Sequence, residues 1–74
     1  GADRFEFSAQ GFGDGEMAWK MPKPGRYRVV LWQGDRQVET VEAMVTPVER
    51  VLRANLGAYG IENVRVEVVY VPGA

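Results

Sequence analysis

The sequence contains neither cysteine nor histidine, and these two absences exclude several kinds of site at once. Without cysteine there is no disulfide, and without both residues the usual ligands of a structural zinc are missing. Mechanisms that need a thiol nucleophile, or a serine activated by histidine, are excluded for the same reason. The lack of cysteine does not fix the redox compartment, because nothing in the chain depends on it. The cellular location therefore stays open.

An excess of charge and a long apolar run are also missing. Lys and Arg together number 9 against 10 Asp and Glu, which gives a formal net charge of -1, and neither sign forms a block. No general attraction to nucleic acid or anionic lipid follows from this balance. Uninterrupted apolar runs such as residues 29–32 are far shorter than the roughly 20 residues of a membrane-spanning helix. We therefore expect no membrane partner.

A chain of 74 residues is long enough for one small domain. At this size a single core rarely supplies more than about 3 to 5 kcal/mol of stability. Because disulfides and zinc are excluded, stability must come from a well-packed core or from oligomerisation. The chain opens with Gly1 and Ala2 rather than with methionine. We therefore expect residues 1–74 to be a single domain, excised from or processed out of a larger protein.

Alternation of apolar and polar residues predicts five β-strands, because side chains on a strand point to opposite faces in turn. The predicted strands are residues 4–10, 16–21, 26–32, 37–45 and 63–71. The first two are expected to pair as a hairpin. Gly34 and Asp35 predict a two-residue type II′ turn between the third and fourth strands. A β-bulge near Thr40 and Val41 is then needed to keep the apolar side chains on one face.

One segment carries the signals of a helix start. Thr46 suits the N-cap, Pro47 the first helical position and Glu49 the third residue of a capping box. Apolar residues then recur at helical spacing, with a glycine to end the helix at Gly57 or Gly60. The residues that define this apolar face are Val48, Val51, Leu52, Leu56 and Tyr59.

These elements predict an α+β fold. We expect a single antiparallel sheet of four to five strands with one helix packed across one face, in the order β-β-β-β-α-β. A helix that crosses the sheet would place the last strand antiparallel beside the first. The alternative is a right-handed crossover that places it parallel to the fourth strand.

The sequence offers no catalytic constellation. Ser8 lies on a predicted strand with no neighbouring base, and Asp14 and Glu16 lie in or beside a predicted hairpin loop where no pocket would perturb them. The glycines of residues 11–15 are followed by a strand, whereas a phosphate-binding loop needs a following helix. We therefore predict no catalytic residue, no cofactor, no metal site and no enzymatic activity.

The third predicted strand raises the functional question, since residues 29–32 are apolar on both faces. If the helix covers one face, the other exposes Trp and Arg, which are enriched at binding hot spots. A curled sheet or a long side chain lying over Trp32 is the alternative explanation. An aromatic residue at the tip of the first hairpin adds to the predicted surface. The predicted interaction surface consists of Trp32, Val30, Arg28, Arg26, Lys20, Arg65 and Phe12.

Two functions of different class fit this surface. The first is a non-catalytic protein interaction or assembly module that uses the face or the edge of the sheet, with a protein partner or a second copy of the chain. The second is a single-stranded nucleic-acid-binding domain that stacks bases on an aromatic and arginine surface. The small net charge weighs against the second.

Overall fold

The computed structural model describes residues 3–8, 16–56 and 64–73. Within these ranges the chain forms six β-strands and no helix. The strands are β1 (Arg4–Ser8), β2 (Glu16–Lys20), β3 (Gly25–Gln33), β4 (Arg36–Val45), β5 (Val51–Asn55) and β6 (Val64–Val71).

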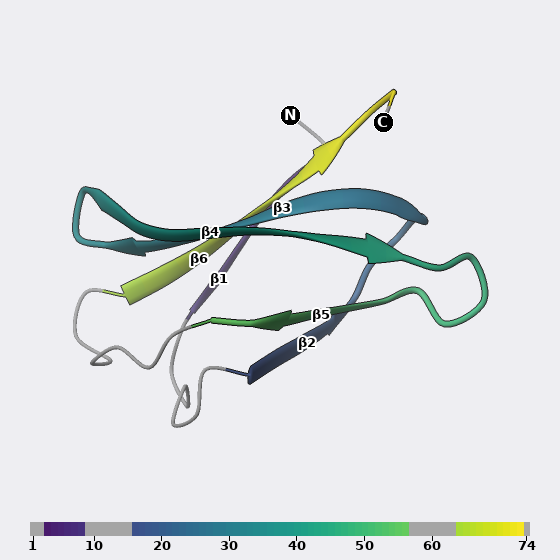
Figure 1. Ribbon diagram of the computed structural model, residues 1–74, viewed down its shortest axis with the longest axis horizontal. Helices are drawn as coiled ribbons and strands as arrows, with labels where there is room; N and C mark the ends of the chain where they lie inside the picture. The colour runs from purple at the N-terminus through teal and green to yellow at the C-terminus, as the bar shows by residue number, and fades with distance from the viewer. Residues whose placement is uncertain (1–2, 9–15, 57–63, 74) are drawn as a thin grey trace.

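The strands form two antiparallel sheets that lie as two layers (Figure 1). One sheet has four strands in the order β1-β6-β3-β4, and the other pairs β2 with β5. Strand β4 passes through the turn at residues 46–50 into β5, so this connection carries the chain from one sheet to the other. The described part of the protein is therefore all-β, with a core enclosed between two sheets.

The core consists of the side chains that face inward from both layers. On the four-stranded sheet, Tyr27, Val29 and Leu31 of β3 alternate along the strand and face the core, as do Val66 and Val68 of β6. Val30 and Glu67 lie between them and are also buried, but on the outer face of the sheet. The two-stranded sheet and its flanking residues contribute the rest. The buried cluster contains Met21, Tyr27, Val29, Leu31, Val45, Leu52, Ala54, Leu56, Val66 and Val68. Phe5, Met17, Trp19, Val64 and Tyr70 are among the partly buried residues that pack against it.

The predicted helix is wrong, and with it the α+β fold class. Residues 46–50 form a single turn in which the Arg50 N–H donates to the Thr46 carbonyl at 3.0 Å. Arg50 then has a φ of 60°, a left-handed conformation that stops the turn after its first hydrogen bond. The capping signals at Thr46 and Glu49 thus start one turn, which Arg50 ends. The chain continues as β5 instead.

The period of burial in β5 explains why this segment is a strand. Leu52, Ala54 and Leu56 are buried, whereas Arg53 and Asn55 are exposed. Leu52 and Leu56 satisfy a helical spacing and a strand alternation equally, so they do not discriminate between the two. Ala54 does, because only the strand places it on the same face as both leucines. Gly57, Tyr59 and Gly60 lie outside the described residues.

The predicted pairing of the strands is partly wrong. The first two strands do not form a hairpin, because β1 pairs with β6 and β2 pairs with β5. Of the two placements considered for the last strand, the structure has the one antiparallel beside the first, and this strand also pairs with β3 on its other side. The predicted single sheet is also wrong, because the short strands β2 and β5, of five residues each, form a second layer.

The β3–β4 hairpin has the predicted turn, but its bulge lies at a different residue from the predicted one. Gln33 pairs with Arg36 across a two-residue loop, and Gly34 has the φ of +64° that a type II′ turn needs at its first central position. The register shifts where Leu31 pairs with Glu39 and Trp32 with Gln37. The extra residue is therefore Val38, which lies nearer the loop than the predicted site at Thr40 and Val41.

A cluster of ring contacts closes one end of the core. Tyr27 pairs with Tyr70 across the strands, with ring centroids 5.2 Å apart and an edge-to-face angle of 66°. The Tyr27 hydroxyl donates to the Lys23 carbonyl at 2.7 Å, and burial raises the pKa of that hydroxyl. The Lys23 ammonium lies 4.1 Å from the centre of the Tyr70 ring and 2.7 Å from a carboxylate oxygen of Asp3. The hydrogen bond to Asp3 raises the pKa of Lys23.

Candidate interaction surface

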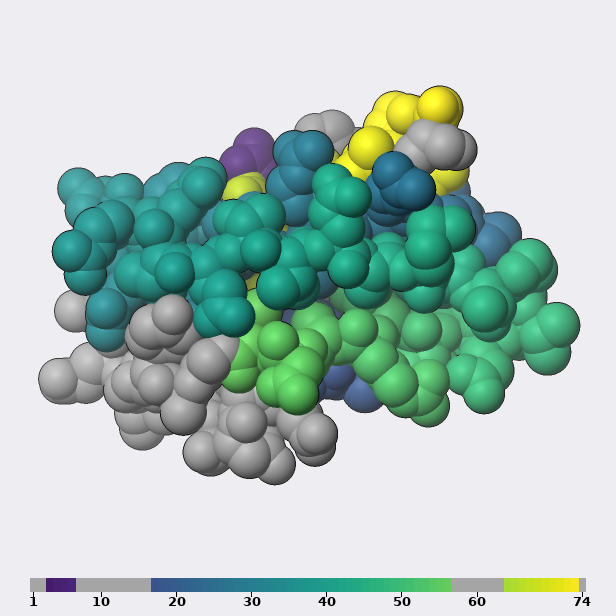
Figure 2. All heavy atoms as spheres, viewed as in Figure 1, coloured from purple at the N-terminus to yellow at the C-terminus, as the bar shows by residue number. Residues whose placement is uncertain are grey.

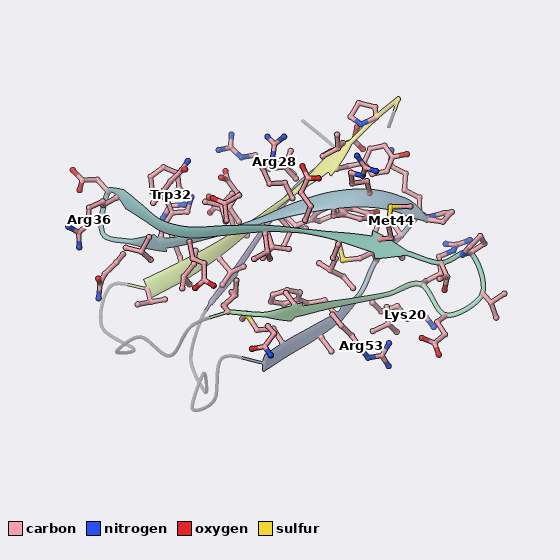
Figure 3. All side chains as sticks on the ribbon, viewed as in Figure 1. Lys20, Arg28, Trp32, Arg36, Met44 and Arg53 are labelled. Atoms are coloured by element: carbon pink, nitrogen blue, oxygen red, sulfur yellow. The ribbon has the colours of Figure 1, made fainter. Side chains whose placement is uncertain are left out.

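The outer face of the four-stranded sheet, the side turned away from the core, carries most of the predicted surface. Figure 3 shows Arg28, Trp32 and Met44 on this side, whereas Lys20 and Arg53 project from the opposite layer. Arg26 and Val30 alternate with the buried residues of β3 and so share the outer face. Arg65 joins them from β6, because it pairs with Trp32. Five of the seven predicted residues therefore lie together: Trp32, Val30, Arg28, Arg26 and Arg65.

The other two predicted residues do not join this face. Lys20 lies on β2, in the two-stranded sheet, and its side chain is exposed on the far side of the molecule. The prediction of Lys20 as a neighbour of Trp32 followed from pairing β2 beside β1, and that pairing is wrong. Phe12 lies outside the described residues.

A buried carboxylate lies at the centre of the outer face. Glu67 is only 4% exposed, although it points away from the main core. The Arg4 guanidinium forms an ion pair and a hydrogen bond with one carboxylate oxygen of Glu67. The indole N–H of Trp32 donates to the other oxygen at 3.2 Å. Both oxygens thus have charged or polar partners, which a buried charge requires.

Trp32 is half-buried, and a side chain of the same face covers it. The Arg65 guanidinium carbon lies 4.7 Å from the centre of the Trp32 ring, in cation–π contact. Arg65 is itself held by Glu6, with 3.4 Å between the charged atoms. Val30, beside them, is only 5% exposed. The apolar outer part of β3 is therefore largely covered by side chains of the chain itself.

The arginines at the other end of β3 also have acidic partners. The Glu42 carboxylate of β4 lies 3.7 Å from Arg28 and 4.0 Å from Arg26. These pairs are about half exposed, so each contributes little to stability. Their effect is to neutralise the face, since each of its arginines lies within 4.0 Å of a carboxylate.

The Arg65 contact leads to a test of how Trp32 is covered. In a Trp19→Phe background, where Trp32 is the only indole, Arg65→Ala is expected to increase quenching of Trp32 fluorescence by acrylamide. The cost in stability is expected to be about 0.5 to 1 kcal/mol, the usual value of an exposed cation–π contact. Arg28→Ala is the control, since Arg28 pairs with Glu42. Equal increases in the two variants would show that Arg65 does not shield the ring.

The sequence predicts the edge of the sheet as a possible contact site but does not indicate which strand forms that edge. Strand β4 is the ten-residue outer strand of the four-stranded sheet, and among the described strands it pairs with β3 alone. The other outer strand, β1, has five residues and carries the charged side chains of Arg4 and Glu6. Short length and charge are the usual protections of an edge against further pairing. β4 has ten residues, twice as many as β1, and so presents a longer edge.

The two halves of β4 differ in this protection. The first half contains the bulge at Val38 and the charged Glu39, which pairs with the buried Leu31 and so lies on the core side. Bulges and inward-pointing charges are devices that prevent a strand from pairing with another chain. Residues 40–45 have neither device, and Glu42 is their one charged residue. No described strand pairs with the outer side of this half, so within the described residues the edge can accept an additional strand.

Two exposed apolar side chains lie at the same end of β4. Met44 is 64% exposed and Val48 is 92% exposed, and they are the exposed large hydrophobic residues of the described part of the chain. Met44 is on β4, and Val48 is in the turn that follows it. The space-filling view shows β4 and this turn extending along the visible face of the molecule (Figure 2). The open half of the edge thus ends in apolar surface.

The two-stranded sheet borders a concavity of about 430 Å³. Its described lining residues are Met17, Ala18, Arg53, Ala54 and Asn55, and the Arg53 guanidinium is paired with Glu49 at 3.0 Å. Across residues 3–8, 16–56 and 64–73, no three acidic side chains gather as metal ligands would. In the same ranges no helix is long and apolar enough to cross a membrane.

Comparison with known proteins adds no constraint on function. No protein-family model, no curated protein and no solved structure matches the chain.

Proposed function

We propose that the chain is a non-catalytic interaction module that binds an extended segment of a protein as an added strand along residues 40–45 of β4. The observation that carries the proposal is the contrast along this outer strand. A bulge and an inward-lying charge protect its first half, whereas six successive residues of its second half lack both. In strand addition the backbone of the edge supplies the affinity, and neighbouring side chains supply the specificity.

Met44 and Val48 fit the second of these roles. Isolated exposed apolar residues are normal on a protein surface, but here both lie at the open end of one edge. An added strand along residues 40–45 would run past Met44 on the outer face and approach Val48 beyond the strand. Its apolar side chains would then meet surface that is otherwise in contact with water.

Single-stranded nucleic acid has less support as the partner. Base stacking needs an accessible aromatic face and free positive charge, and here Arg65 lies over Trp32. Arg26 and Arg28 share one carboxylate, so they do not add an unbalanced positive patch. A labelled oligonucleotide is expected to show no salt-dependent binding to the chain.

The edge is tested with a pair of proline variants. Successive residues of an edge strand direct their N–H groups alternately toward the sheet and away from it. One of Glu42→Pro and Ala43→Pro therefore breaks a hydrogen bond to β3, while the other removes only an outward donor. We expect one variant of the pair to remain folded by circular dichroism and thermal unfolding.

The probe is a phage-displayed library of random seven-residue peptides. Selection on the wild-type domain is expected to enrich extended peptides rich in β-branched and aromatic residues, and the folded proline variant is expected to lose their binding. Arg28→Ala is the control, because it alters the face of the sheet without altering the β4 backbone or placing like charges opposite each other. The proposal is wrong if no peptide is enriched, or if Arg28→Ala abolishes binding and the folded proline variant retains it.

A further inference from the structure

We infer that the segment added to β4 is β4 of a second copy, paired antiparallel about a two-fold axis that passes beside Ala43. This inference rests on the proposed function and names the partner. A symmetric pairing needs an edge that is complementary to itself, since each residue meets its own counterpart in reverse order. The sequence of residues 40–46 meets this condition over its whole length in the register centred on Ala43.

In that register Ala43 lies opposite Ala43 of the second copy. Glu42 then lies opposite Met44, Val41 opposite Val45 and Thr40 opposite Thr46. Residues paired in this way stay on the same face, so the outer face of one copy continues into the outer face of the other. Threonine pairs and β-branched pairs are favourable cross-strand neighbours. No two carboxylates meet.

The two neighbouring symmetric registers are both worse. Centring the pair on Met44 would place Val41 opposite Pro47 and so shorten the paired segment to residues 42–46. Centring the pair on Glu42 would place two glutamates directly opposite each other, and like charges in that position are destabilising. In the Ala43-centred register the paired segment also has natural limits. The next pair outward joins Glu39, at the bulge, with Pro47, which has no N–H to donate.

The charges of the whole chain do not oppose self-association. The formal net charge is -1, so two copies repel each other only weakly. Glu42 already has Arg26 and Arg28 beside it, within 4.0 Å, so its charge is balanced before the copies meet. Joining the edges makes one eight-stranded sheet from two four-stranded ones and removes the open edge of both copies.

A pair of cysteines tests this register, because the chain has no cysteine of its own. Thr40 and Thr46 are both exposed, and the register places them opposite each other in the two copies. We expect mild oxidation to convert most of the double variant Thr40→Cys, Thr46→Cys to a covalent dimer. Within one chain the two positions are about 20 Å apart at 3.3 Å per residue, too far for an internal disulfide.

The single variants are the matched controls. Thr40→Cys alone, and Thr46→Cys alone, would place the two thiols of a dimer about 20 Å apart, so both are expected to stay unlinked. Cross-linking of a single variant as readily as the double would overturn the register. An unlinked double variant would do the same. A native chain that sediments as a monomer at every concentration would overturn the second-copy inference, while the peptide selection still tests the edge itself.

A lysine and a glutamate in place of Met44 are expected to affect the affinity of the dimer in opposite senses. Met44→Lys places a lysine opposite Glu42 of the second copy twice per dimer, and Met44→Glu places a glutamate there. We expect the dimer dissociation constants of the two variants to differ by at least about five-fold, with the lysine variant tighter. Within one chain Met44 pairs with Arg26, so the effect on folding has the opposite sense. Equal weakening by both would mark Met44 as a simple apolar contact and contradict the register.

Discussion

Gly25→Ala is expected to unfold most of the domain at 25 °C. Gly25 has a φ of +131°, a conformation that residues with a side chain rarely adopt. A Cβ at this position would lie 2.8 Å from Cε1 of Tyr70 and 3.1 Å from its hydroxyl oxygen. The Tyr70 ring has little freedom to move, because Tyr27 packs against it and Lys23 lies over it.

The two costs of this substitution add. Backbone strain contributes about 1 to 3 kcal/mol, and overpacking against the ring contributes a similar amount. Their sum of roughly 2 to 6 kcal/mol is comparable to the whole stability of a domain of this size. Urea unfolding followed by circular dichroism measures the loss.

Gly34→Ala is the matched control for Gly25→Ala. Gly34 also has a positive φ, of +64°, but a Cβ there would have no heavy atom within 4 Å. Only the backbone term remains, so a loss of about 1 to 2 kcal/mol is expected. Equal losses in the two variants would mean that the approach of Tyr70 to Gly25 contributes nothing.

The strands could be predicted from the sequence wherever polar and apolar residues alternate without interruption. Five of the six strands were located in this way, including β3 with its hairpin turn at Gly34. Their pairing could not be predicted, because it depends on contacts between segments distant in sequence. Strand β1 chooses β6 rather than β2 as its neighbour, and no pattern within either segment encodes that choice.

The sixth strand was mistaken for a helix because local signals and tertiary packing disagree there. Thr46, Pro47 and Glu49 favour a helical turn, and one turn forms. A short helix gains most of its stability from burying one face. Here Leu52 and Ala54 can lie together on the buried face only when the chain is extended, because a helix would place them on different faces. Packing therefore overrides the capping signal.

Only part of the candidate site could be predicted from the sequence, because some of its contacts join segments that are distant in the chain. Alternation along β3 placed Arg26, Arg28, Val30 and Trp32 on one face, and the structure places them there. The ion pairs that balance this face could not be predicted, since Glu67 and Arg4 are 63 positions apart in the chain. The position of β4 as an outer strand also depends on the order of the strands in the sheet. Reading each strand alone does not reveal which of them lies outermost.

Ala54→Asp is expected to destabilise the domain more than Asn55→Asp does. A strand at residues 51–55 requires this order, and the predicted helix would reverse it. Ala54 is 7% exposed, opposite Met17 on the inner side of β5, so an aspartate there would bury a charge among apolar side chains. We expect a loss of roughly 2 to 4 kcal/mol in the free energy of unfolding. Thermal and urea unfolding of the purified variants measure this loss.

Asn55 follows Ala54 in the chain and is exposed, so Asn55→Asp is expected to change stability by no more than about 0.5 kcal/mol. In a helix the order would reverse, because Asn55 would lie on the apolar face between Leu52 and Leu56, and Ala54 would turn away from it. A larger loss for Asn55→Asp than for Ala54→Asp would therefore contradict β5 and return the segment to a helix. The paired comparison is independent of any partner, since it reports only which side of the segment faces the core.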